Sequence, residues 1–294
     1  MAREVVVATD SAASFAPNEA ERMGVAKLPL HIVWPNGSQT TDAEMSPEDF
    51  YKKMLREGIP TTSGANVSDF LDLYRNLIAA GAKKILSIHV SGIKSMVLAS
   101  ARIAAEMLNE ADPNLHIQTV DSRAVSGSQL YVVEAAAAAV ARGASFEESA
   151  LVAEAASKNV ELYITLPNLE HVIRGGRLKG ASAILASALR ILPLISMQED
   201  GDLHITQKIR GDAAKVRGRM VEVVESLADQ NGLPERIGVI YTQIKDLGDE
   251  VREAIKARLN IAVDEPREAG SVLAVHAGPG ATGIALRWKL HETI

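Results

Sequence analysis

Short apolar runs alternate with amphipathic stretches through the first half of the chain. Residues 5–9 and 84–90 are rich in β-branched side chains and predict buried parallel strands, and residues 28–34 and 117–120 predict two more. Helices are expected between them; one start signal is Ser-Pro-Glu-Asp at residues 46–49. This alternation is typical of a parallel, Rossmann-like sheet covered by helices on both faces.

The second half of the chain has a different pattern. Strands expected at residues 194–198 and 203–210 flank Glu-Asp-Gly-Asp, which indicates a β-hairpin. The other expected elements are strands at 162–166, 237–242 and 272–275 and helices at 212–227 and 246–258. We therefore predict an α/β protein of two domains, a parallel-sheet domain at residues 1–160 and a smaller α+β domain at residues 161–294.

One almost uninterrupted apolar stretch lies at residues 181–195. Such a stretch fits either a helix packed in the core or a wall around an apolar ligand. The candidates for such a wall are Ile184, Leu185, Leu189 and Leu192.

Three hydroxyl residues, Thr61, Thr62 and Ser63, stand just before a predicted helix. Asn66 is suited to be the N-cap of that helix, and Asp69 occupies the capping-box position. The free N–H groups and the dipole at a helix N-terminus favour an anion such as a carboxylate. An ordinary loop before a capped helix is the alternative.

Two more polar loops follow predicted strands. Asp10 and Ser11 end the first strand, at the edge where ligands of open α/β sheets gather. Capping of the next helix is the alternative role for both residues. Ser91, Gly92 and Ser95 form a second hydroxyl-bearing loop after the third predicted strand.

Composition and charge exclude several classes of function. The net charge of −6 and the absence of a basic stripe argue against a nucleic-acid partner. The chain has no cysteine, and its seven histidines are not at metal-ligand spacing, so neither a metal nor a cofactor is expected. The first residues do not resemble a signal peptide, and the longest apolar run, residues 135–141, is too short for a membrane span. A soluble cytoplasmic protein is expected.

Two glycine-rich segments lie in the second half. Residues 278–283 mimic a dinucleotide-binding fingerprint, but Pro279 removes an N–H from the phosphate cradle and too little chain follows for a βαβ unit. Gly175 and Gly176 precede Arg177. This is either a plain helix stop with a surface arginine or a glycine turn that brings the arginine near an anion.

The order and spacing of several short motifs resemble the DegV family of bacterial fatty-acid-binding proteins over nearly the full chain. The motifs are Thr9-Asp10-Ser11, Pro29-Leu30, Thr62-Ser63 with Asp69-Phe70, residues 91–101, Asp121-Ser122, Gly175-Gly176-Arg177, Lys208-Ile209-Arg210 and residues 276–280, His-Ala-Gly-Pro-Gly.

The resemblance implies a DegV-like fold whose two domains hold one long-chain fatty acid, of the C16–C18 type, between them. It also implies a non-catalytic protein that presents this acid to a fatty acid kinase, which makes an acyl phosphate for phospholipid synthesis. Transient membrane contact during lipid exchange would suit that role. The residues expected at the carboxylate are Thr62, Ser63, Ser91, Ser95 and His276. Those expected in its vicinity are Asp10, Ser11, Thr61, Gly92, Arg177 and Gly278.

The chain departs from the family pattern after the third strand. The usual run is similar to Ser-Ser-x-Leu-Ser-Gly-Thr, whereas residues 91–97 read Ser-Gly-Ile-Lys-Ser-Met-Val. Because one serine and the Gly-Thr pair are replaced, we expect the head group to depend more on Thr62 and His276.

Two functions from other classes stay open. A serine-dependent acyl hydrolase would use Ser11, Ser63, Ser91 or Ser95 with His276, although the chain has no Gly-x-Ser-x-Gly elbow. A domain that binds a small polyol or triose is the other alternative, because hydroxyl-bearing loops also suit a small polar ligand.

Overall fold

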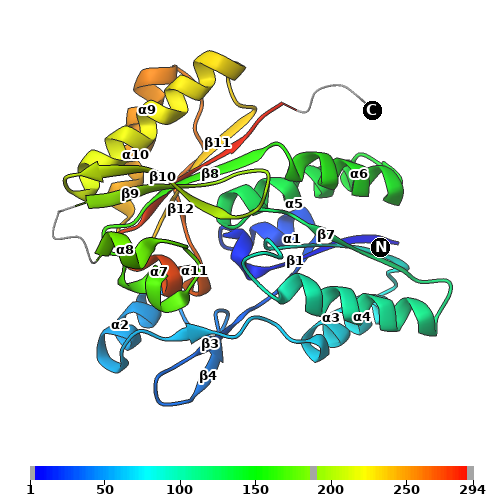
Figure 1. The fold of residues 1–294 in the computed structure, drawn as a ribbon. Coiled ribbons are helices and arrows are strands. Elements are labelled where there is room, and N and C mark those ends of the chain that lie inside the picture. The colour runs from blue at the N-terminus through cyan, green and yellow to red at the C-terminus, as the bar shows by residue number, and fades with distance from the viewer. Residues whose placement is uncertain (1–3, 186–190, 290–294) are drawn as a thin grey trace.

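Three sheets form the framework of the protein (Figure 1). The computed structural model describes residues 4–185 and 191–289. The first sheet is parallel throughout, in the order β2 (Val25–Leu28), β1 (Val5–Asp10), β6 (Lys84–His89) and β7 (His116–Asp121). The predicted parallel sheet of the first half is therefore confirmed.

Helices cover both faces of this first sheet, because neighbouring strand residues point to opposite sides. Ile85 packs into a cluster with α3 (Val67–Ala79) and α4 (Val97–Ala111). Leu86 packs on the other face with α5 (Ser126–Ala141) and α6 (Phe146–Ser157). The two predicted helix starts are confirmed, with Ser46 capping α2 (Pro47–Glu57) and Asn66 capping α3, and Ser145 caps α6. The short η1 (Ser11–Ala13) and α1 (Glu19–Met23) follow β1.

Helix α5 lies between the first and second sheets. Its side chains share one buried cluster with Val7 of the first sheet and with Leu162, Met197 and Ala285 of the second. A helix that is apolar on nearly every side is stable where every side is covered. The alanine-rich sequence of α5 meets that condition, and its small side chains let both sheets approach closely.

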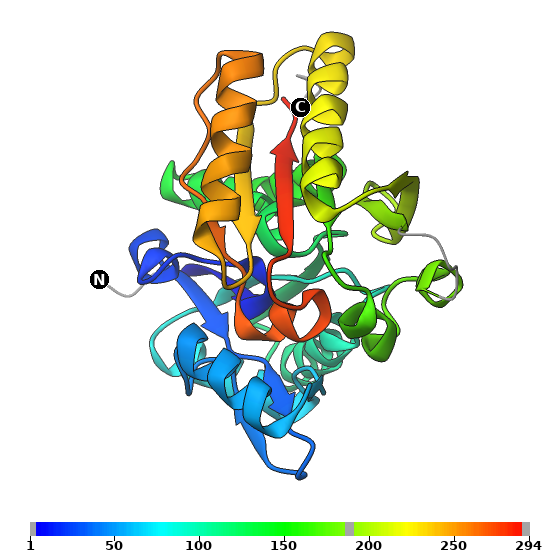
Figure 2. The same cartoon turned by 90° about the vertical axis from the view of Figure 1, so that its left-hand side faces the viewer.

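The second sheet has six strands and is mostly antiparallel, with only its last pair parallel. Its order is β10 (Leu203–Arg210), β9 (Ile191–Met197), β8 (Val160–Thr165), β13 (Thr282–Arg287), β11 (Arg236–Tyr241) and β12 (Arg267–Glu268). Figure 2 shows α9 (Ala213–Asn231) and α10 (Lys245–Leu259) side by side over one face. The shorter α7 (Glu170–Gly175), α8 (Ala181–Leu185) and α11 (Ser271–Ala277) lie toward the first sheet.

A small third sheet of β4 (Gln39–Thr41), β3 (His31–Val33) and β5 (Thr61–Thr62) is antiparallel. Its β5 contains Thr61 and Thr62, so pairing with β3 fixes the position of these two residues of the hydroxyl-bearing loop 61–63. The predicted single strand at residues 28–34 is wrong. Pro29 has no N–H to donate and stands between β2 and β3, which belong to different sheets.

The predicted strand at residues 272–275 is also wrong, since this segment is part of α11. A four-residue apolar run does not distinguish a strand from a buried helix by its pattern. Gly270 and Gly278 bound the helix on either side. The pattern also missed β13, a central strand of the second sheet. The predicted β9–β10 hairpin is confirmed.

The proposed domain boundary near residue 160 stays a prediction, although β7 ends at Asp121 and β8 begins at Val160, in the other sheet. Among the described residues, no helix is both long and apolar enough to cross a membrane.

Candidate ligand-binding site

A cavity lies between the loops of the first sheet, one face of the second sheet and helices α7 and α11. The centres of water-sized molecules can occupy about 230 Å³ of it, whereas a single water needs only ~10–15 Å³. Apolar side chains make up most of the wall: Leu162, Ile164, Leu166, Val172, Ile195, Met197, Leu203, Ile240, Val272 and Leu273.

The alternation of side chains along β8 explains the apolar wall. Leu162 and Ile164 face the cavity, as does Leu166 just after the strand, whereas Tyr163 packs with α9 and α10 on the opposite face. A residue period of two is that of a strand with different surroundings on its two faces. The cavity therefore suits a long apolar group better than a polar one.

Thr62 and His276 meet at the cavity, with 2.8 Å between Oγ1 and Nε2. Thr62 is held by the pairing of β5 with Ile32 of β3. His276 lies in the last turn of α11, and the contact of His171 Nδ1 with the Val275 carbonyl, at 3.0 Å, ties this helix to α7. Residues 214 positions apart are thus brought together by β3, β5, α7 and α11.

The double glycine of α7 makes room for His276. A Cβ on Gly175 would lie 2.2 Å from His276 Nδ1, so no larger residue fits without a shift. Gly176 has φ +67°, the left-handed conformation that ends the helix. Arg177 then lines the cavity. The glycines therefore act both as a helix stop and as a close-approach site.

Burial, the nearby Arg177 guanidinium and His171 lower the pKa of His276 to about 4, so its ring is neutral at pH 7. Nδ1 is buried and has no hydrogen-bond partner among the described residues. Placing the proton on Nε2 leaves only an acceptor unpaired, whereas a proton on Nδ1 would bury an unpaired N–H. The geometry favours Nε2–H donating to Thr62 Oγ1, which leaves the Thr62 hydroxyl proton for a ligand.

Residues 4–289 match the family model described as "Uncharacterised protein, DegV family". The chain belongs to the DegV family. DegV domain-containing protein SCO2569 of Streptomyces coelicolor is 28% identical over 290 residues, or 97% of this chain and 99% of the relative.

Two solved DegV structures have the same fold, which confirms the predicted fold class. The Thermus thermophilus DegV family protein, described for its fatty acid binding, is 28% identical with a TM-score of 0.84 and covers 98% of this chain and 100% of its own. DegV of Bacillus subtilis, described as a fatty acid binding protein, is 26% identical with a TM-score of 0.84; the coverage is 97% of this chain and 99% of its own.

The structure brings only part of the residues predicted at the carboxylate or in its vicinity to the cavity. Thr62, Ser63, Ser95, Arg177 and His276 line it. Ser95 Oγ also accepts from the Val97 N–H, as a residue at a helix start does.

The remaining predicted residues of the first-sheet loops do not line the cavity. Ser91 Oγ donates to the Gly201 carbonyl of the β9–β10 turn at 2.7 Å, and the Gly92 N–H points to Asp121. Asp10 is a buried cap that accepts from the N–H groups of Ala12 and Val90.

Ser11, Thr61 and Gly278 have local roles. Ser11 Oγ accepts from the Leu30 N–H at 3.1 Å, and Thr61 is exposed in β5. Gly278 lies against His171, because a Cβ there would be 2.7 Å from the ring. Ser11, Thr61 and Gly278 therefore belong to the structure around the cavity and do not line it.

Of the candidate tail wall at residues 181–195, Ile195 lines this cavity, whereas the named candidates Ile184, Leu185 and Leu192 do not. Ile184 is buried in a cluster with Leu178, Leu185 is 59% exposed, and Leu192 packs toward α9 on the other face. Leu189 lies outside the described residues. Strands supply much of the wall, and the residue of the apolar stretch that lines the cavity, Ile195, belongs to β9.

Sequence reasoning missed Lys94, which lines the cavity beside Ser95. The signal was present, because a lysine stands where the DegV pattern has a leucine. Its ammonium pairs with Asp202 and donates to the Arg177 carbonyl at 3.1 Å.

An Asp-His-Ser row also exists, but away from the cavity. His89 contacts Asp10 through Nδ1 and Ser87 through Nε2, at 3.0 and 2.7 Å. All three residues are fully buried, and Tyr74 donates to the same serine hydroxyl. The row stabilises the carboxyl ends of β1 and β6. No group of three or more potential metal ligands occurs in residues 4–185 and 191–289.

Proposed function

We propose that this protein binds one long-chain fatty acid, with its carboxylate at Thr62, Ser63 and Ser95, with His276 orienting the Thr62 hydroxyl, and with its chain in the apolar cavity. The observation that carries the proposal is the 2.8 Å Thr62–His276 contact at an otherwise apolar cavity. The fatty acid binding described for the Thermus thermophilus and Bacillus subtilis relatives supports it.

The energetics of such a ligand divide between chain and head group. A sixteen-carbon chain buried at ~0.8 kcal/mol per methylene gives a gross gain on the order of 12 kcal/mol. A hydrogen bond to a charged group contributes about 1.5–3 kcal/mol. The chain therefore sets most of the affinity, and the hydroxyl groups, with Thr62 oriented by His276, set the orientation of the ligand.

We infer that the protein is a non-catalytic carrier. A hydrolase with His276 as base would need a carboxylate or another acceptor to orient its ring. His276 Nδ1 faces Gly175 and has no partner in the described part of the chain. A polyol or triose ligand is disfavoured, since most of the wall offers it no hydrogen bonds.

Extraction of the purified protein tests the proposal directly. Expression in bacteria should fill an apolar cavity with cell lipid, since such a space binds apolar molecules readily. Mass spectrometry of the organic extract should find about one fatty acid of the C16–C18 type per chain. Repeated absence of fatty acid from folded protein, together with failure to take up added hexadecanoate, would overturn it.

We further propose that the bound acid is presented to a fatty acid kinase for acyl phosphate formation. Arg174 supports this idea, because it is an exposed cation on α7 close to Arg177, and arginine pairs well with phosphate. Arg174→Glu should slow acyl phosphate formation by a cognate kinase without changing lipid content, whereas Arg142→Glu, at the exposed residue that follows α5, should not. Equal rates for both variants would reject this docking role.

Transient membrane contact for lipid exchange, a place in phospholipid synthesis and cytoplasmic localisation stay predictions.

A further inference from the structure

Lys94 brings a positive charge to the wall of the cavity. It lies in the loop between β6 and α4, and its side chain is only 11% exposed. The ammonium pairs with Asp202 of the β9–β10 turn and donates to the Arg177 carbonyl. A lysine ammonium has three donors, and the contacts found among the described residues use two of them.

The described cavity wall has no acidic side chain to balance the positive charge of Lys94. Lys94 and Arg177 both line the cavity, and its described lining contains no aspartate or glutamate. Asp202, which pairs with Lys94, also contacts Lys179, with 3.4 Å between Oδ2 and the Lys179 Nζ. Burial opposes its ionisation, but the hydrogen bonds from Lys94 and the Leu203 N–H and the charge of Lys94 outweigh burial and lower the pKa of Asp202 to about 2. The polar part of the cavity wall formed by Thr62, Lys94, Arg177 and His276, here called the mouth, thus holds two cationic side chains, and the described lining has no acidic one.

We propose that Lys94 is the cationic partner of the ligand's carboxylate, held in position by Asp202 and the Arg177 carbonyl. This inference rests on the proposed fatty acid binding and adds a residue to it. Val97 stands where the family pattern has a threonine, so that hydroxyl is missing here. The Lys94 ammonium of the same loop would replace it as a donor to the head group. A charge-assisted contact is stronger than one from a neutral hydroxyl.

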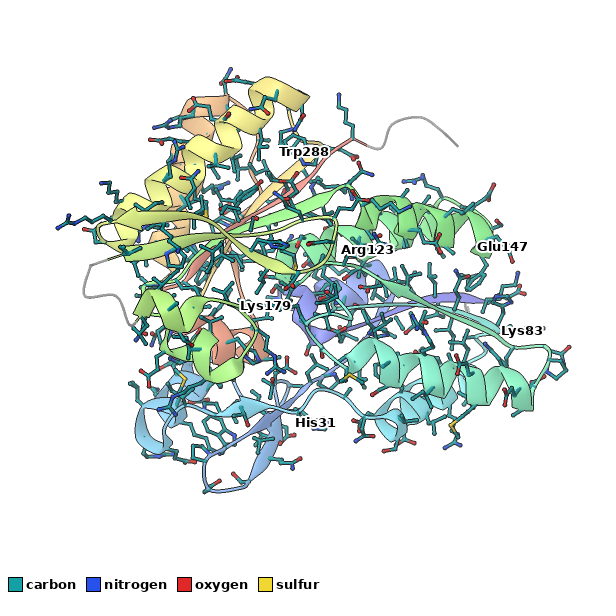
Figure 3. The ribbon with its side chains drawn as sticks, viewed as in Figure 1. His31, Lys83, Arg123, Glu147, Lys179 and Trp288 are labelled. Carbon is teal, nitrogen blue, oxygen red and sulfur yellow. The ribbon has the colours of Figure 1, made fainter. Side chains whose placement is uncertain are left out.

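The turn that carries Asp202 has anchors of its own. Ser91 Oγ donates to the Gly201 carbonyl at 2.7 Å, and Arg123 Nη1 donates to the Glu199 carbonyl at 3.4 Å. Figure 3 labels Arg123 and Lys179 in this region. A Cβ on Gly201 would lie 2.9 Å from Ser91 Oγ, so the turn is seated closely. Removing the Lys94 charge should therefore leave the turn in place.

The test compares hexadecanoate with its uncharged methyl ester on delipidated protein, by competition against a fluorescent fatty acid. Lys94→Met keeps an apolar stem and removes the charge, and Lys94→Arg keeps the charge. Lys179→Met is the matched control, because Lys179 contacts the same Asp202 but is 88% exposed and does not line the cavity.

We expect Lys94→Met to weaken hexadecanoate binding about 10-fold or more, as for a lost charge-assisted bond, and to change ester binding much less. Lys94→Arg should retain most of the preference for the acid, and Lys179→Met should leave both affinities near wild type. Added salt should weaken acid binding in the wild type more than in Lys94→Met.

Equal losses for acid and ester in Lys94→Met would make Lys94 a residue that only closes the mouth, and unchanged affinities would give it no role at the head group. Either result overturns the inference about Lys94. If the wild-type protein still binds hexadecanoate, the proposed fatty acid binding is not affected. A wild-type protein that binds neither ligand would overturn both.

Discussion

The wall of the cavity and its mouth are built in different ways. Neighbouring strands of one sheet supply much of the wall, each by the same alternation of side chains, as Leu162 and Ile164 show in β8. The mouth is assembled from Thr62, Lys94, Arg177 and His276, which come from segments far apart in the chain. Each of these has its own specific partner.

The difference separates affinity from selectivity. Apolar burial is roughly proportional to area and does not depend on direction, so many wall residues share the affinity. A hydrogen bond depends on distance and angle, so one altered mouth residue removes its whole contribution. Changes in the wall should weaken an acid and its ester alike, whereas changes in the mouth should distinguish the two.

The largest expected effect comes from a charge in the wall. Ile164→Glu places a carboxylate in the middle of the apolar face, where an unpaired charge costs several kcal/mol. Hexadecanoate and methyl hexadecanoate should both lose at least about 100-fold in affinity, equivalent to about 2.7 kcal/mol. Fluorescence competition measures both ligands. Lys208→Glu, on the exposed side of β10, is the control and should bind like wild type. A selective loss of the acid alone would contradict a shared apolar wall.

A smaller and selective effect is expected from Thr62→Ala. Loss of a hydroxyl that donates to a carboxylate costs about 1.5–3 kcal/mol, or roughly 10- to 100-fold, for the acid only. The same competition assay should show a much smaller change for the ester. Thr62→Ser should retain the preference, and Thr61→Ala, at the exposed neighbour, should leave both affinities unchanged. Equal losses with a lowered melting temperature would make Thr62 a structural residue.

Gly175→Ala tests the fit between α7 and His276. The added methyl would lie 2.2 Å from Nδ1, so helix or ring must move, and such overpacking costs about 1–3 kcal/mol of folding stability. Denaturant unfolding measures the loss, and acid-over-ester preference should fall with it. Gly176→Ala is the matched control, because no atom lies within 4 Å of its added Cβ and only its positive φ is penalised. It should cost about 1 kcal/mol and keep the preference. If both variants keep the wild-type preference for acid over ester, the packing of Gly175 against His276 does not affect head-group binding.

Much of the fold follows from local signals in the sequence. The buried runs of β1 and β6 and the capping residues Ser46, Asn66 and Ser145 act within a few positions, so the pattern locates them. Residues 272–275 were misassigned because their structure is decided by packing. His276 reaches Thr62 only if that segment is helical, and no local preference encodes this requirement.

The candidate site was predictable in part for the same reason. Thr62, Ser95 and His276 came from family motifs, and they do line the cavity. For the tail wall, an apolar stretch does not reveal which surface it covers: Ile195 of β9 lines the cavity, whereas Ile184 of α8 does not. The long-range contact of Lys94 with Asp202 has no local signal other than the departure from the family pattern.

The smallest expected effect concerns the protonation of His276. Burial, Arg177 and His171 lower its pKa in the folded protein to about 4, against an ordinary value of 6.5. Between these values the unfolded chain binds a proton that the folded protein does not. The stability gained from a neutral His276 is therefore fully present above pH 6.5 and is lost as the pH falls toward 4.

By pH 5.5 the loss should be on the order of 1 kcal/mol, since a full pKa unit corresponds to about 1.4 kcal/mol. Denaturant unfolding of delipidated protein at pH 7.5 and 5.5 should show wild type losing about that much more stability than His276→Gln. Carboxyl groups such as Asp42 and Glu134, whose pKa values burial raises, titrate in both proteins and cancel in the difference. An equal loss in both proteins would mean that His276 accepts a proton as easily when folded as when unfolded. Protonated His276 would then be a third cation beside Lys94 and Arg177. In that case the affinity for the acid should increase as the pH falls.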